Sequence, residues 1–115
     1  MKIKIDPLDK LFAKVILLRD KYCRRCGGSG GLQTSHFHGR SKRSVRWDED
    51  NAVLLCFGCH QYFHSQPQEH VEWFKQRLGE EKYNNLRGRM RQIGKPDKVL
   101  IGLYLKERIK ELEKR

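Results

Sequence analysis

The pattern of apolar and polar positions changes several times along the chain. After Asp6, a favourable N-cap followed by proline, apolar residues recur every three or four positions, which predicts a helix that leads to the first cysteine. Residues 32–38 and 52–55 are short and extended in character, and they predict two strands joined by a polar stretch. Helical character returns near Cys59. The first half of the chain is therefore expected to form helix, strand, strand and helix.

Three more helices are predicted in the second half. The first ends at Gly79, the second covers residues 80–93, and the third begins at Asp97. Ser65 is a candidate cap for the first of them. The sequence thus predicts an α+β fold, with a functional core in residues 1–65 and a helical extension, residues 66–115, packed on or beside that core.

Composition and charge point to a polyanionic partner. The chain has 115 residues, of which 37% are hydrophobic and 34% charged, so its core is thin and a metal would help to hold it together. The formal net charge is +11, and nucleic acid is the expected partner because neutralising phosphates releases counterions. The alternative to a nucleic-acid-binding protein is a basic protein whose charge serves only solubility. No apolar run is long enough to span a bilayer, and we expect a cytoplasmic protein, in a bacterial host if a phage encodes it.

Four cysteines occur as two pairs with the spacing of metal ligands. The pairs are Cys23-x-x-Cys26 and Cys56-x-x-Cys59. Two such pairs commonly close a tetrahedral zinc site of four thiolates. Two disulfides are the alternative, but in a reducing compartment free thiols favour metal. We therefore predict a structural Zn²⁺.

The polar residues between and after the cysteine pairs need a separate explanation. His36 and His38 fall two apart in the first predicted strand, so we expect them on one face, with either available as a general base. Asn51 precedes the second strand and could orient the basic imidazole. His60 and His64 lie four apart on the predicted helix, where their rings could hold a divalent cation. Phosphodiester hydrolysis requires these parts.

Cations in the polar stretch complete the predicted site. Arg40, Lys42, Arg43 and Arg46 belong to an exposed basic loop in this interpretation and would bind DNA phosphates. His70 matches no motif and is predicted to lie on the surface. The cations of the last helix are interpreted as a solvated face.

At this point the order of motifs resembles a known family. The sequence CxxC, His, Asn, CxxC-His is similar to the zinc-supported branch of the HNH (ββα-metal) nucleases. Residues 35–40, 46–51 and 56–60 are most similar to phage recombination nucleases of the lambda NinG (Rap) type, and residues 78–83 extend that likeness more loosely.

The resemblance implies roles for individual residues. It makes His36 the general base, Asn51 its orienting residue, and His60 and His64 the ligands of a catalytic Mg²⁺ or Mn²⁺, which Zn²⁺ or Ni²⁺ can replace. It also implies cleavage of DNA to 5′-phosphate and 3′-hydroxyl ends, with branched recombination intermediates as substrates. Many family members carry an aspartate or histidine ligand where this chain has Ser35, so His36 and His38 could divide the base and ligand roles differently.

Two other interpretations stay open from the sequence. One is a non-catalytic zinc-finger module that binds DNA, which would need the cysteines and the basic surface but not Asn51 or the helical histidine pair. The other concerns assembly: the apolar faces of the last two helices permit a homodimer.

Overall fold

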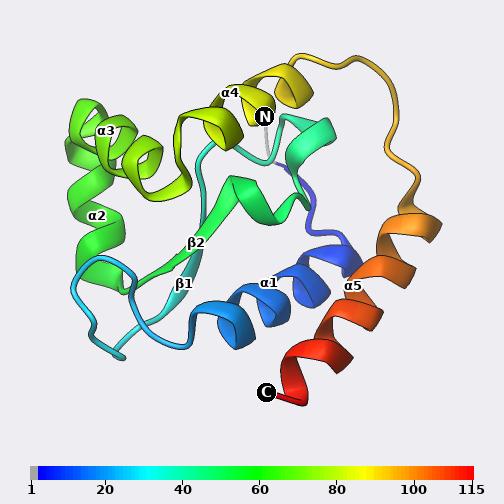
Figure 1. The fold of residues 1–115 in the computed structure, drawn as a ribbon, viewed down its shortest axis with the longest axis horizontal. Helices are drawn as coiled ribbons and strands as arrows, with labels where there is room; N and C mark the ends of the chain where they lie inside the picture. Colours follow the sequence, from blue (N-terminus) through cyan, green and yellow to red (C-terminus); the bar gives the residue numbers. More distant parts are fainter. Residues whose placement is uncertain (1–2) are drawn as a thin grey trace.

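Two short strands at the centre of the chain pair with each other and collect helices on both of their faces (Figure 1). The computed structural model describes residues 3–115. The strands are β1 (Gln33–His36) and β2 (Ala52–Leu55), and the 3-10 turns η1 (Arg43–Val45) and η2 (Glu49–Asn51) lie between them. The helices are α1 (Pro7–Asp20), α2 (Phe57–Ser65), α3 (Pro67–Leu78), α4 (Glu80–Met90) and α5 (Lys98–Glu113). The predicted α+β class is confirmed.

The register of the hairpin decides which residues face which helix. The strands are antiparallel, with Gln33 opposite Leu55 and His36 opposite Ala52. Directly opposed residues point to the same face of a sheet, and successive residues alternate. Val53 and Leu55 are buried with Phe63 of α2, whereas Ala52 and Leu54 are buried with α1. One face of the hairpin therefore meets α2 and the other meets α1.

The largest core joins the two ends of the chain. Phe12 and Ile16 of α1 pack with Leu105 and Ile109 of α5, so the last helix lies beside the first (Figure 1). The N-terminus of α1 forms a capping box. The Asp9 carboxylate accepts the backbone N–H of Asp6, and the Asp6 carboxylate accepts the backbone N–H of Asp9. Leu105 and Ile109 of α5 are thus buried within the chain, whereas Val99, Leu100 and Leu103 are exposed, and the homodimer stays a prediction.

The third core fixes α3 and α4 over the polar stretch that follows β1. Val45 of η1 is buried with Phe74 of α3 and with Tyr83 and Leu86 of α4. Phe37, the first residue after β1, stacks on Phe74 with ring centroids 4.2 Å apart. The helices beyond residue 65 therefore help to place the segment that carries the candidate site.

Element ends agree with the predictions except at the first strand and at three helix boundaries. The strand expected over residues 32–38 covers only Gln33–His36. The helix expected near Cys59 begins at Phe57, and the helix expected to reach residue 93 ends at Met90. Ser65 does not cap α3, because it is the last residue of α2 and its hydroxyl donates to the Tyr62 carbonyl. None of the helices in residues 3–115 combines the length and the apolar character that a membrane span requires.

Candidate functional site

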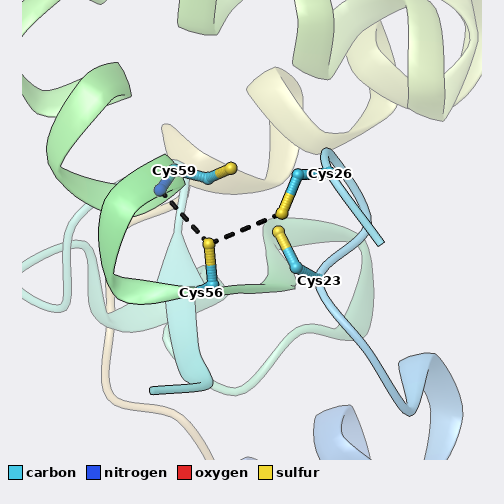
Figure 2. Close-up of side chains that lie close together, drawn as sticks. All are labelled: Cys23, Cys26, Cys56 and Cys59. Carbon is cyan, nitrogen blue, oxygen red and sulfur yellow. Dashed lines mark hydrogen bonds between the residues drawn. The ribbon is translucent and has the colours of Figure 1, made fainter. Parts of the chain in front are cut away.

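The four cysteines meet where the first helix, the hairpin and α2 converge. Their sulfur atoms all lie within 4.8 Å of one another, and Cys26 Sγ is 3.7 Å from Cys56 Sγ. Figure 2 shows both pairs directed at one centre, from the turn after α1 and from the start of α2. A Zn–S bond of about 2.3 Å gives a tetrahedron with edges of about 3.8 Å. The cluster is compatible with zinc binding, as its spacing predicted.

Local backbone geometry explains why each pair can bend around a metal. Gly27 adopts φ of +79°, a left-handed conformation that favours glycine, and its N–H donates to the Cys23 carbonyl at 2.9 Å. The N–H of Gly28 points at Cys26 Sγ at 3.4 Å. In the second pair, Cys56 is the N-cap of α2 and its sulfur accepts from the N–H of Cys59. Backbone N–H groups therefore point at the sulfur atoms of Cys26 and Cys56.

The protonation of the cysteines reflects this crowding. Burial raises the pKa of Cys23, but backbone N–H groups of Cys26, Cys56 and Arg25 outweigh burial and lower that pKa to about 6. Burial raises the pKa of Cys59 to about 12, against the opposing effect of the Arg25 guanidinium at 3.4 Å. A divalent cation would favour the thiolate form of all four side chains.

His36 ends β1 as an oriented, half-buried imidazole. Its Nε2 lies 2.9 Å from the Arg46 carbonyl oxygen, and its ring is 5.4 Å from the ring of Phe12 on α1. A carbonyl only accepts, so Nε2 carries the hydrogen and the lone pair is on Nδ1. Burial lowers the pKa of His36, and the nearby charge of Arg40 acts in the same direction. The ring is therefore neutral near pH 7.

Asn51 does not contact the His36 ring, which corrects the expected base-orienting role. Its Oδ1 accepts from the N–H of His38 at 2.8 Å, and its Nδ2 donates to the carbonyls of His38 and Val45 at 2.9 and 3.0 Å. The side chain is fully buried. Asn51 therefore anchors both ends of the basic loop, and the Arg46 carbonyl takes the place expected of Asn51 beside His36.

His38 departs from the expected shared face with His36. The strand ends at His36, and Phe37 turns toward α3 and α4. Burial lowers the pKa of His38, followed by the charges of Arg87 on α4 and Lys42, so its ring lies on the α4 side. Its Nε2 is buried and has no hydrogen-bond partner within residues 3–115. His38 therefore lies beyond the strand that carries His36, and the choice between them as the base stays a prediction.

His60 and His64 lie one turn apart on α2, as predicted. His60 is half-buried, and its Nδ1 makes a short hydrogen bond to Gln33 Oε1 of β1. The amide oxygen only accepts, which leaves the lone pair on His60 Nε2. Burial lowers the pKa of His60, and the charge of His64 adds to the effect. A ring nitrogen held in this way is typical of a metal-binding histidine.

The hairpin separates these helical histidines from the His36 ring. Gln33 and Ser35 share the face that α2 covers, whereas His36 faces α1. The His36 ring and the α2 histidines can therefore meet only around the end of β1, and their joint role stays a prediction. The cause is strand alternation, which places consecutive side chains on opposite faces. Among the described residues, the histidines form no group of three ligands as close as the cysteine cluster.

His70 is placed beside the site, and its prediction as a surface residue is wrong. Its ring stacks on Phe63 at 4.7 Å and lies edge-on to Phe37 at 5.2 Å. Burial lowers the pKa of His70, and the charge of His60 contributes. The packing against Phe63 and Phe37 comes from α3 folding back over α2. No spacing in the sequence signals that contact.

The predicted basic loop divides into exposed and buried cations. Lys42 and Arg43 are exposed, and Arg40 is partly exposed near His36. Arg46 is buried instead: its guanidinium bonds Asp9 Oδ2 at 2.6 Å and the Lys4 carbonyl at 2.8 Å. The assignment of Arg46 to DNA binding is therefore corrected, because an acid on α1 pairs with its charge.

Comparisons with known proteins add no relative. No protein-family model, no curated protein and no solved structure matches this chain.

Proposed function

We propose that this protein is a metal-dependent endonuclease that hydrolyses DNA phosphodiester bonds, with His36 as the general base. The observation that carries the proposal is the hydrogen bond from His36 Nε2 to the Arg46 carbonyl. That bond fixes the tautomer and leaves Nδ1 free to take a proton from water, while burial keeps the ring neutral by lowering its pKa. Arg40 beside the ring supplies positive charge for a phosphate.

His60 and His64 are the proposed ligands of the catalytic ion. The Gln33 bond leaves His60 Nε2 free, and His64 is exposed one turn further along α2. Two imidazoles leave open coordination positions for water and phosphate oxygen. The ion, Mg²⁺ or Mn²⁺ with Zn²⁺ or Ni²⁺ as substitutes, supplies polarisation of the phosphate and stabilisation of the leaving 3′-oxygen when bound.

The direction of α2 suggests where the phosphate would lie. His60 is next to Gln33, at the start of β1, and Phe63 contacts His70, which contacts Phe37 just beyond the end of β1. The helix therefore runs along β1, and one helical turn of about 6 Å brings His64 level with roughly two strand residues. The phosphate is proposed to lie at the end of β1, between His64 and His36.

The cysteine cluster is proposed to hold structural Zn²⁺. It joins the end of α1 to the start of α2, so a metal there would fix the helix that carries His60 and His64. Four thiolate ligands leave no open position for substrate. The cluster would thus act on catalysis only through the placement of α2.

DNA is the proposed substrate because of charge and resemblance. The net charge of +11 favours a polyanion. The likeness to HNH nucleases, and within them to NinG-type recombination nucleases, supports phosphodiester hydrolysis and branched recombination intermediates as the preferred substrate.

A second candidate is a zinc-stapled DNA-binding module without catalysis. The observation in its favour is that His36 faces α1 while α2 covers the opposite face of the hairpin. In that case the cysteines and the basic surface would be sufficient, and the histidines would be structural.

Plasmid cleavage separates the two candidates. Wild-type protein with added Mg²⁺ or Mn²⁺ is compared with His36→Ala, His64→Ala and Gln61→Ala, the last being a control at an exposed neighbouring position on α2. The nuclease proposal predicts cleavage by wild type and the control, and losses of about 100-fold or more in both histidine variants. Absence of cleavage with every metal, while DNA binding persists, would favour the binding module.

A further inference from the structure

Most arginines that are packed against the body of the domain are already paired with acids. Arg89 of α4 bonds Asp48 at 2.7 Å and Asp50 at 3.2 Å. Arg108 of α5 bonds Glu49 at 3.0 Å. The acidic turn 48–50 is therefore neutralised by helices that pack on it. Cations without such partners are the ones available for an external anion.

Several exposed cations form no ion pair in residues 3–115, and four of them lie on two neighbouring elements. Two come from the loop after β1 and two from the end of α4: Lys42, Arg43, Arg87 and Arg91. Arg87 and Arg91 are one turn apart, which places them on the same side of the helix. Positive side chains are favourable near a helix C-terminus, but this does not account for the opposing pair from the loop.

Contacts between η1 and α4 bring the two pairs together. The Ser44 hydroxyl, next to Arg43, donates to the carbonyl of Met90 at 3.3 Å, next to Arg91. Lys42 and Arg87 both lower the pKa of His38, after burial, so both lie near that ring. Figure 1 shows α4 beside the turn that contains η1. The four cations therefore lie on neighbouring segments, which we call the α4 basic surface (Lys42, Arg43, Arg87 and Arg91).

The like charges of the α4 basic surface repel one another, which lowers the stability of the folded state. Exposed like charges one helical turn apart destabilise a helix by about 0.2–0.5 kcal/mol per pair. The acids of turn 48–50 bond Arg89 and Arg108 instead, and within residues 3–115 none of them forms an ion pair with the four cations. A row of backbone phosphates would relieve it, since each contact neutralises one cation and releases a counterion.

We infer that the α4 basic surface binds the phosphate backbone of duplex DNA. The inference rests on the proposed function for its choice of DNA and for the position of the cut. The backbone would run from α4 across Lys42 and past His38 toward Arg40 and the end of β1. The helical extension is thereby assigned a direct part in substrate binding, in addition to packing.

Salt-dependent DNA binding tests the inference. The affinity of a labelled DNA duplex is measured by fluorescence anisotropy across NaCl concentrations, without added divalent cation, for wild type and for Arg87→Gln combined with Arg91→Gln. The matched control is Lys106→Gln combined with Lys110→Gln, which removes the same charge from exposed positions one turn apart on α5. The zinc content of each variant shows that it has folded.

Loss of two phosphate contacts is expected to reduce the slope of log affinity against log salt by about 2. The α5 control should keep the wild-type slope. Equal slopes in the α4 and α5 variants, or no DNA binding by wild type, would overturn the inference. The cleavage assay separates the two proposals. A reduced slope without cleavage under any metal would support DNA binding by the α4 basic surface and contradict the nuclease proposal. Cleavage with an unchanged slope would support the nuclease proposal and contradict DNA binding by this surface.

Discussion

The amide of Asn51 is bonded to both backbone groups of His38, accepting its N–H at 2.8 Å and donating to its carbonyl at 2.9 Å. A third bond reaches the Val45 carbonyl at 3.0 Å. The buried amide therefore closes the loop between β1 and η1 as a strand partner would. This loop carries Arg40 and Lys42 and ends near the carbonyl that orients His36, so Asn51 is a positioning residue for the whole candidate site.

Replacement of Asn51 by alanine should destabilise the fold. Three hydrogen bonds are lost, and an N–H and two carbonyls are left buried, so the free energy of unfolding should fall by about 2–4 kcal/mol. Urea denaturation of Asn51→Ala and wild type measures the difference. Asn84→Ala, at an exposed position on α4, is the control and should change stability by less than about 0.5 kcal/mol. A wild-type midpoint for Asn51→Ala would contradict this role.

Two arginines of the loop differ in burial, and this difference gives a second prediction. Arg46 is buried on Asp9, whereas Arg40 is partly exposed and 3.9 Å from the same carboxylate. Removal of one partner from a buried pair costs about 3 kcal/mol, so Arg46→Gln should lower thermal stability strongly. Arg40→Gln should weaken DNA binding with little change in melting temperature. A large loss of melting temperature in Arg40→Gln and none in Arg46→Gln would contradict this arrangement of the loop.

Stability should fall in mild acid because several histidines are buried as neutral rings. Burial lowers the pKa of His36, His38 and His70 in the folded state. The unfolded chain, with histidine pKa values of about 6.5, then binds protons first as the pH falls, and protonation favours unfolding. Stability measured by denaturation should therefore decrease between about pH 7 and pH 5.

Carboxylates act in a separate pH range. Burial acts to raise the pKa values of Asp9 and Asp20. Hydrogen bonds from Arg46 to Asp9 and from Arg19 to Asp20 act in the opposite direction, and both pKa values are lowered in the folded state. Their contributions are present above about pH 4 and are lost as the pH falls further. A stability that is flat or rising as the solution is acidified from about pH 7 to pH 5 would contradict the burial of the histidines.

Metal removal tests the cysteine cluster. We expect about one zinc ion per chain by mass spectrometry, a lower melting temperature after treatment with a chelator, and recovery on addition of zinc. Cys56→Ser should reduce zinc content and stability, because Cys56 both joins the cluster and caps α2. Ser29→Ala, in the exposed loop after the first pair, is the control. An unchanged melting temperature without metal would show that the thiols alone hold this region.

The sequence was sufficient for features that depend on neighbours along the chain. The strand Ala52–Leu55 was predicted at its observed bounds because an apolar run lies between a polar turn and a cysteine. The cysteine cluster followed from spacing, since two CxxC pairs bend by local geometry. The proline and Asp6 likewise predicted the start of α1.

Features that depend on tertiary partners were not predictable in the same way. The burial of Arg46 depends on Asp9, which is 37 residues away along the chain. The position of His70 depends on α3 folding back onto Phe63. The His36 ring faces α1 because successive strand residues alternate between faces. A two-residue spacing could not show that His38 would lie beyond the end of the strand. Each of these differences arises from an element that packs from outside the motif.

The most direct measurement of the central claim is the single-turnover rate of DNA cleavage by His36→Ala, with and without added imidazole. A general base should contribute about 10²–10⁴-fold, so the variant should be slower by that factor, and free imidazole should restore part of the rate. Gln61→Ala should match wild type under the same conditions. Cleavage by His36→Ala at the wild-type rate would contradict the role proposed for His36.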